Sequence, residues 1–361
     1  MIEQFKKLSR MHTRFVNKFL FLYLSFFTIT TKLFHEPWRD EYQILGFLNH
    51  FPTKNDIFKE ATAELLSPIF YYLVKALAID GSYFFYSWII VLISLFFSYK
   101  VIMKESVPIY VKIILVLPHI WFHWIVITRV YSFLFIFILI FISLDSRSKF
   151  YARNRLITLS CMNLLSIFGI ILSITLYILR KFQHSNSSTS LKSELIYLIS
   201  LIFGTYPYII RPLTDVYYLK SNRVTSFYEY FINFKTFILN QINLFIGLPQ
   251  DHFHFLTRGT EYFPLSKYFV LGIFIVGIMV MLKFILTLKW YLGLLIISSN
   301  VFLINWYVVV FQGADRHWIY LLIFNVVVFS DIEKRSFSSF KLIRKFLAGT
   351  LLIILFIHTC I

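Results

Sequence analysis

Apolar segments recur along the whole chain, and they constrain its fold more than any other feature. Of the 361 residues, 58% are hydrophobic and 20% aromatic. Judged against the roughly 20 residues that a helix needs to cross a bilayer, many segments are candidate membrane spans. The sequence therefore predicts an all-α protein, a polytopic transmembrane helical bundle of about 10–12 spans forming a single integral membrane domain, 1–361. The candidate segments are 15–34, 66–79, 83–99, 107–127, 131–144, 156–179, 192–210, 228–247, 266–287, 289–311, 316–331 and 343–360.

The basic residues lie between these segments rather than on one amphipathic face. A net charge of +17 fits nucleic-acid binding in principle, but this distribution favours the positive-inside rule of membrane proteins. It predicts a cytoplasmic N-terminus, a retained N-terminal anchor and no nucleic-acid partner. The segments expected outside are 35–65, 180–191, 248–265 and 311–315.

Segment 66–79 is an exception to the regular alternation of spans. It is short and carries Lys75 in its middle. If it crossed the membrane, Lys100 and Lys104 would lie outside, against the charge bias. An interfacial or re-entrant segment is therefore expected here, which leaves about eleven spans and an external C-terminus.

The first extracytoplasmic loop, 35–65, concentrates carboxylates. It holds six of the eighteen acidic residues, whereas 180–191 holds none. Asp40 and Glu41 follow the first apolar segment within a few residues, beside the interfacial aromatic Trp38. Partial desolvation raises the pKa of a carboxylate toward that of a useful general base, so this loop is the candidate catalytic segment.

Two arginines are expected on the same side as the acidic loop. Arg129 precedes Tyr131, and Arg316 precedes His317. Either arginine alone is typical of a snorkelling anchor. Together, next to aromatic or histidine side chains, they indicate an anion site, because guanidinium groups match phosphate oxygens.

A carboxylate base and phosphate-binding arginines suit one reaction well. The base deprotonates an acceptor hydroxyl, which attacks the anomeric carbon of a sugar carried on a lipid phosphate. The arginines stabilise the charge that develops on the leaving phosphate.

Several stretches resemble the GT-C superfamily of polytopic glycosyltransferases, which includes protein O-mannosyltransferases and lipid A aminoarabinose transferases. They are HEPWRDEYQILGFL after the first segment, ELLSPIFYYLVK, RVY, and GADRHWIYLLIF. The resemblance implies a bacterial inner-membrane enzyme that uses a polyprenyl-phosphate sugar donor and a glycan, lipid or protein acceptor. It implies that Asp40 is the catalytic base and Glu41 its partner.

The same resemblance assigns the donor site. It places Arg129 and Arg316 at the donor phosphate, with His317 where the family usually has Tyr. Arg39 is a secondary candidate. Many members carry His-Pro-Pro before the second hydrophobic segment, whereas this chain has Ser67 and Pro68; Glu64 is the candidate for that position.

Two alternatives remain. A purely structural membrane partner gives no account of the clustered carboxylates. A lipid-linked saccharide flippase, polymerase or transporter would also use arginines against lipid phosphates, but such proteins usually carry midplane charges and repeated halves. No cofactor is expected. Asp40 and Glu41 offer oxygen ligands to a divalent ion, but no partner acidic motif accompanies them, and His252 and His254 lack further ligands for zinc.

Overall fold

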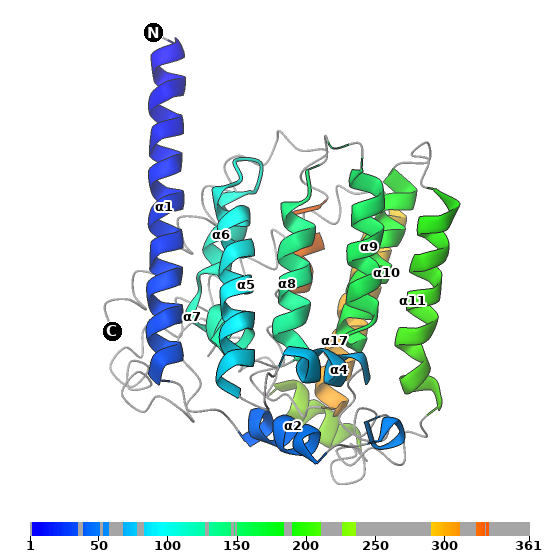
Figure 1. Cartoon of the computed structure of the whole chain (residues 1–361). Helices are drawn as coiled ribbons and strands as arrows, with labels where there is room; N and C mark the ends of the chain where they lie inside the picture. Colours follow the sequence, from blue (N-terminus) through cyan, green and yellow to red (C-terminus); the bar gives the residue numbers. More distant parts are fainter. Residues whose placement is uncertain are drawn as a thin grey trace. The chain divides into compact units, whose positions relative to one another are not determined.

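The computed structural model describes slightly more than half of the chain, and every element in that part is helical (Figure 1). Its described residues contain no strand, which confirms the all-α class. The described residues are 2–34, 39–50, 53–57, 68–77, 83–126, 130–145, 148, 150–183, 190–210, 226–235, 290–310, 323–328 and 330–331. The principal helices are α1 Ile2–Phe34, α2 Arg39–Asn49, α4 Pro68–Leu77, α5 Tyr83–Met103, α6 Ile109–Leu115, α7 Pro118–Trp121, the π-helix η2 Phe122–Val126, α8 Val130–Ser143, α9 Tyr151–Asn163, α10 Ile167–Gln183, α11 Leu191–Ile210 and α17 Trp290–Val310.

The chain divides into two compact units. Unit 1 comprises Met1–Ala61, Leu66–Ser166 and Thr189–Gly204, and unit 2 comprises Thr62–Leu65, Ile167–Ser188 and Thr205–Ile361. The expectation of a single membrane domain stays a prediction.

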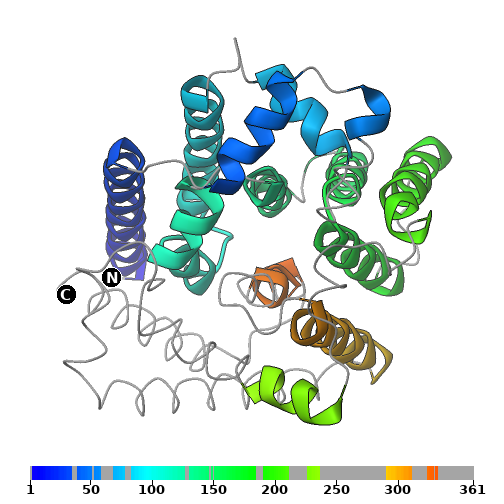
Figure 2. The same cartoon turned by 90° about the horizontal axis from the view of Figure 1, so that it is seen from below.

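Unit 1 contains a bundle of long helices in which α1 packs on α5, α5 on α8, and α8 on α9 (Figures 1 and 2). Aromatic rings fill the contacts between them. The ring centroids of Phe21 and Tyr99 lie 5.0 Å apart between α1 and α5, and those of Tyr86 and Phe133 lie 6.3 Å apart between α5 and α8. Such pairs contribute about 0.5–1.5 kcal/mol each beyond the area they bury.

Two short helices, α2 and α4, lie across the end of this bundle at which α1 ends and α5 begins (Figure 1). Phe47 of α2 packs on Tyr71 of α4, with ring centroids 5.7 Å apart. Phe70 of α4 packs on Phe133 of α8 at the same distance, 5.7 Å. The described part of α4 is ten residues long, and whether segment 66–79 is interfacial or crosses the membrane stays a prediction.

The polarity of α1 is the reverse of that of a helix on a soluble protein. Its outer face is a stripe of large apolar side chains that are 38–71% exposed and recur at alternating spacings of four and three residues. The stripe spans about 27 Å of helix, close to the roughly 30 Å of a hydrocarbon core. The inner face buries the polar side chains of Asn17, Thr28 and Lys32. The stripe consists of Phe15, Phe19, Leu22, Phe26, Ile29 and Leu33.

The helix α5 has the same inverted pattern. Ser87, Ser94 and Ser98 are buried, whereas Leu92 and Phe96 are more than half exposed. Small polar residues between helices and apolar residues on the outside are typical of helices packed in lipid.

The helices differ in how well their length alone suits a membrane. Among the described residues, one helix, Phe84–Met103, is long and apolar enough to cross a bilayer by length and composition. Val130–Ser143 and Tyr291–Asn305 are apolar but shorter. The number of spans stays a prediction.

Two predicted segments are each interrupted. Segment 107–127 is divided into α6, α7 and η2, because Pro118 has no backbone N–H with which to continue α6. Segment 156–179 is divided into α9 and α10, and α9 begins earlier than expected, within the basic cluster 147–155. There, Arg155 is fully buried with its guanidinium 4.7 Å from the ring centroid of Phe141.

In unit 2, α10 packs against α17 through polar contacts within apolar helices. The hydroxyl oxygens of Thr175 and Ser299 lie 3.0 Å apart. Asn300 and Asn325 exchange two amide hydrogen bonds of 3.1 and 2.7 Å. Asn300 Nδ2 also donates to the Ile296 carbonyl at 2.9 Å, and polar contacts of this kind between helices are typical of packing in an apolar medium.

Candidate functional site

The direction of the α6–η2 segment fixes which end of unit 1 holds the candidate site. The segment runs parallel to α1, so both end at the same end of the bundle. Three contacts, in the same order along both segments, establish this: Asn17 Oδ1 with Lys112 Nζ at 3.2 Å, the rings of Phe27 and Trp121 at 6.4 Å, and Lys32 Nζ with the Val126 carbonyl oxygen at 2.9 Å.

The parallel direction of α1 and α6–η2 bears on where the segments of the predicted site begin. The chain continues from α1 into the acidic loop, and α2 begins five residues after Phe34. From Val126 it continues through residues 127–129 to Val130, the first residue of α8. The last residue of α1, Phe34, and the last residue of η2, Val126, therefore lie at the same end of the bundle.

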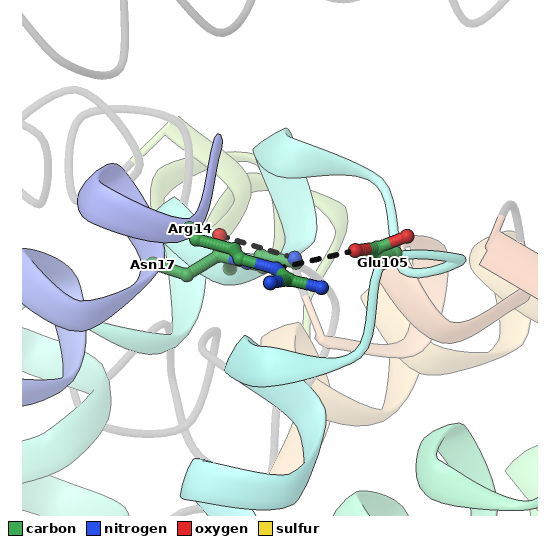
Figure 3. A network of polar contacts seen from close by, with 4 residues as sticks. Arg14, Asn17 and Glu105 are labelled. Carbon is green, nitrogen blue, oxygen red and sulfur yellow. Dashed lines mark hydrogen bonds and ion pairs between the residues drawn. The ribbon is translucent and has the colours of Figure 1, made fainter. Parts of the chain in front are cut away.

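A second polar cluster lies near the middle of α1 (Figure 3). Arg14 Nε lies 3.8 Å from Glu105 Oε1, with both side chains mostly exposed. One turn further along α1, Asn17 accepts the hydrogen bond from Lys112. Together with the contact between Lys32 and Val126, this cluster attaches α1 to the bundle near its middle and at its C-terminal end.

The contact between Lys32 and Val126 is the most informative polar feature near the candidate site. Lys32 is 5% exposed and lies in the last turn of α1. Val126 ends η2, and carbonyls at a helix C-terminus have no partner within the helix. The ammonium satisfies this carbonyl and favours the negative end of the helix dipole. A hydrogen bond from a charged donor contributes about 1.5–3 kcal/mol.

The π-helix itself is a functional signal, since π turns occur frequently at functional sites. Within it, Trp124 is buried and packs on two residues of α8. Its ring centroid lies 6.4 Å from that of Tyr131 and 5.5 Å from that of Phe135. The start of α8 is therefore held by aromatic packing as well as by the lysine.

Tyr131 is the member of the predicted site whose side chain the structure describes. It is half-buried in the first turn of α8, against Trp124. Arg39, Asp40 and Glu41 are the first three residues of α2, and their side chains lie outside the described part. Glu64, Arg129, Arg316 and His317 also lie outside the described residues. That these groups meet in one pocket stays a prediction.

The helix that carries Asp40, α2, is packed against the rest of unit 1. Leu45 and Leu48 of α2 are buried, and Phe47 packs on Tyr71 of α4. Because α4 in turn packs on α5, the acidic helix is attached to the bundle rather than to a free loop. A catalytic group requires such support, because small displacements reduce rates strongly.

Farther along the loop, Asp56 has a structural role. Its carboxylate accepts hydrogen bonds from the backbone N–H and the hydroxyl of Thr53, at 2.9 and 2.6 Å. This is a local turn contact on an exposed segment. The hydrogen bonds of Asp56 therefore account for this carboxylate without a catalytic role.

As to metals, the described residues contain no group of three or more His, Cys, Asp or Glu side chains that could hold an ion. Asp40 and Glu41, the carboxylates that could offer oxygen ligands to a divalent cation, have side chains outside the described part.

Sequence reasoning missed Lys32 and η2. The signal for Lys32 is a single lysine inside the last turn of an apolar segment, directly before the acidic loop. A snorkelling side chain explains that pattern equally well, so the sequence does not distinguish the two. The π turn has no sequence signature of its own.

Comparison with known proteins gave no further information. No protein-family model matches the chain, and neither a curated protein nor a solved structure matches it.

Proposed function

We propose that this chain is a polytopic membrane glycosyltransferase of the GT-C type. It transfers a sugar from a polyprenyl-phosphate donor to an acceptor at the extracytoplasmic face. Asp40 is the general base, Glu41 assists it, and Arg129 and Arg316 bind the donor phosphate, with Arg39, Glu64, Tyr131 and His317 lining the donor site.

The membrane part of the proposal is supported by the inverted polarity of the described helices. Apolar stripes on α1 and α5 face outward and small polar residues lie inside. A soluble monomer rarely exposes apolar area of this extent. The basic loop after α5 and the acidic helix α2 also lie at opposite ends of α5, as the positive-inside rule expects.

The single observation that carries the catalytic part is the hydrogen bond from Lys32 to Val126. It brings together the chain segments that lead to Asp40 and to Arg129. A base and a phosphate-binding arginine on opposite ends of the bundle would rule out the reaction. The register of α1 with α6–η2 supports the arrangement that the reaction needs.

The test uses the full chain in membrane vesicles with polyprenyl-phosphate hexoses and pentoses, and it measures release of polyprenyl phosphate. Asp40→Asn should lower the rate by a factor of about 10²–10⁴, the usual contribution of a general base. The matched control is Asp56→Asn, which changes another carboxylate of the same loop that the structure shows in a turn.

Equal rates for Asp40→Asn and Asp56→Asn would refute the assignment of the base. Donor that crosses the bilayer without losing its sugar would indicate a flippase or transporter instead.

A further inference from the structure

Lys32, in the last turn of α1, is buried, and burial of a charged side chain is costly. It is buried on the inner face of the helix, as are Leu24 and Thr28. A charged group there requires a compensating interaction, and the Val126 carbonyl at 2.9 Å supplies one. A methionine would fill the same volume without that requirement.

A second lysine makes the same kind of contact at the other end of the bundle. Lys104 Nζ donates to the carbonyl oxygens of Ser143 and Leu144, at 2.9 and 2.7 Å, where α8 ends. Both lysines therefore satisfy carbonyls at a helix C-terminus. They differ in the segment that each one holds: Lys104 holds a loop on the basic side, whereas Lys32 holds the junction that leads to Arg129.

The sequence distances around Lys32 are short. Asp40 follows Lys32 by eight residues, and Arg129 follows Val126 by three. One hydrogen bond thus joins two backbone segments close to the points at which both proposed catalytic elements begin. Displacement of either segment would change their separation, and a displacement of about 1 Å is enough to lower an enzymatic rate about 10²-fold.

We propose that Lys32 is a positioning residue of the transferase: its ammonium holds the η2–α8 junction against the end of α1, and so fixes the phosphate-binding segment relative to the acidic helix. This inference rests on the proposed function. Lys32 acts through the Val126 carbonyl and does not touch the substrate.

The experiment compares Lys32→Met with Lys104→Met in the full chain. Both variants remove an ammonium that satisfies carbonyls at a helix end. Lys32→Met should lower kcat for a polyprenyl-phosphate sugar by about 10–100-fold, whereas Lys104→Met should keep kcat near that of the wild type. Lys32→Arg retains an N–H donor and should recover much of the lost rate.

Hydrogen exchange tests the contact between Lys32 and the Val126 carbonyl without depending on activity. Backbone hydrogen exchange in 122–131 should become faster in Lys32→Met and remain unchanged in Lys104→Met. If Lys32→Met fails to fold, Lys32→Gln, which keeps a shorter neutral donor, gives the same comparison.

The outcomes are separable. Equal kcat values and equal exchange rates for the two methionine variants would overturn the positioning role. Full activity of Asp40→Asn would overturn the proposed function, whatever Lys32→Met does. An inactive Asp40→Asn together with a fully active Lys32→Met would overturn this inference alone.

Discussion

Gly204 gives the sharpest test of how the helices of unit 1 pack. Ser200 and Gly204 are four residues apart on α11, the spacing of small residues that lets two helices approach closely. Asn163, the last residue of α9, donates from Nδ2 to Ser200 Oγ at 3.1 Å. A Cβ built on Gly204 would collide with the Asn163 carbonyl oxygen and lie 2.9 Å from its carbonyl carbon. Backbone atoms of Asn163 cannot rotate away, so α11 must shift.

The expected effect of Gly204→Ala combines two opposing contributions. Overpacking costs about 1–3 kcal/mol, and alanine recovers about 0.5–1 kcal/mol of helix propensity. The free energy of unfolding should therefore fall by about 0–2.5 kcal/mol.

Gly46 is the matched control, because it is also helical and a Cβ there meets no atom within 4 Å. Gly46→Ala should raise the free energy of unfolding by about 0.5–1 kcal/mol. The assay is reversible unfolding in mixed micelles, followed by helical circular dichroism for both variants and the wild type. If Gly204→Ala is as stable as Gly46→Ala, the close contact between α9 and α11 is absent and the argument fails.

Two further predictions concern charged groups on the basic side of unit 1. Burial lowers the pKa of Lys104 below its ordinary value of 10.5, and the nearby Asp145 opposes this in part. The unfolded chain therefore binds more protons between the lowered pKa and 10.5, so the free energy of unfolding should rise as pH increases through that interval. Lys104→Met should reduce this rise in urea unfolding at a series of pH values; an unchanged slope would contradict the assignment. Separately, Glu105→Gln removes the exposed ion pair with Arg14 and a charge near Lys112, and it should change stability by about 0–1 kcal/mol. Asn17→Leu deprives buried Lys112 of a partner and should cost about 1–3 kcal/mol; equal effects of the two would contradict this difference in burial.

Most of the described helices could be predicted from apolar segments alone, because a long apolar segment has few other stable conformations in an apolar medium. The boundaries agree within a few residues where an apolar segment is uninterrupted. The agreements are 83–99 with α5, 131–144 with α8, 192–210 with α11 and 289–311 with α17.

The interruptions have different physical origins. Pro118 divides the segment 107–127. This interruption could be predicted from the sequence, because proline has no N–H to donate to the preceding turn. The end of α9 could not be predicted from the sequence. There, Leu164 N–H bonds to the Cys161 carbonyl, and the side chain of Asn163 is engaged by Ser200 of a helix 37 residues away. Tertiary contacts of this kind leave no local pattern.

The candidate site shows the same limit. The acidic concentration in 35–65 and the aromatic after Arg129 are visible in the sequence, whereas the parallel register of α1 and α6–η2 is not. That register depends on the contacts that Asn17, Phe27 and Lys32 make with the segment α6–η2. Contacts between residues so far apart in the sequence leave no periodic pattern by which they could be predicted. That charge alternation places residue 129 on the outer side stays a prediction, and no pattern in the sequence indicates the contact between Lys32 and Val126.

The break at Pro118 also bears on the choice between a transferase and a transporter. Transporters often bind ions at carbonyls released where a helix is broken. Here the released carbonyls have backbone partners: Val116 N–H donates to Ile113 and Leu117 N–H donates to Ile114, at 3.1 and 3.2 Å. The broken segment is therefore closed by its own turn hydrogen bonds in the described structure. Its distal end, at Val126, instead receives a lysine beside the acidic loop, which favours chemistry at the bundle end over ion binding at the break.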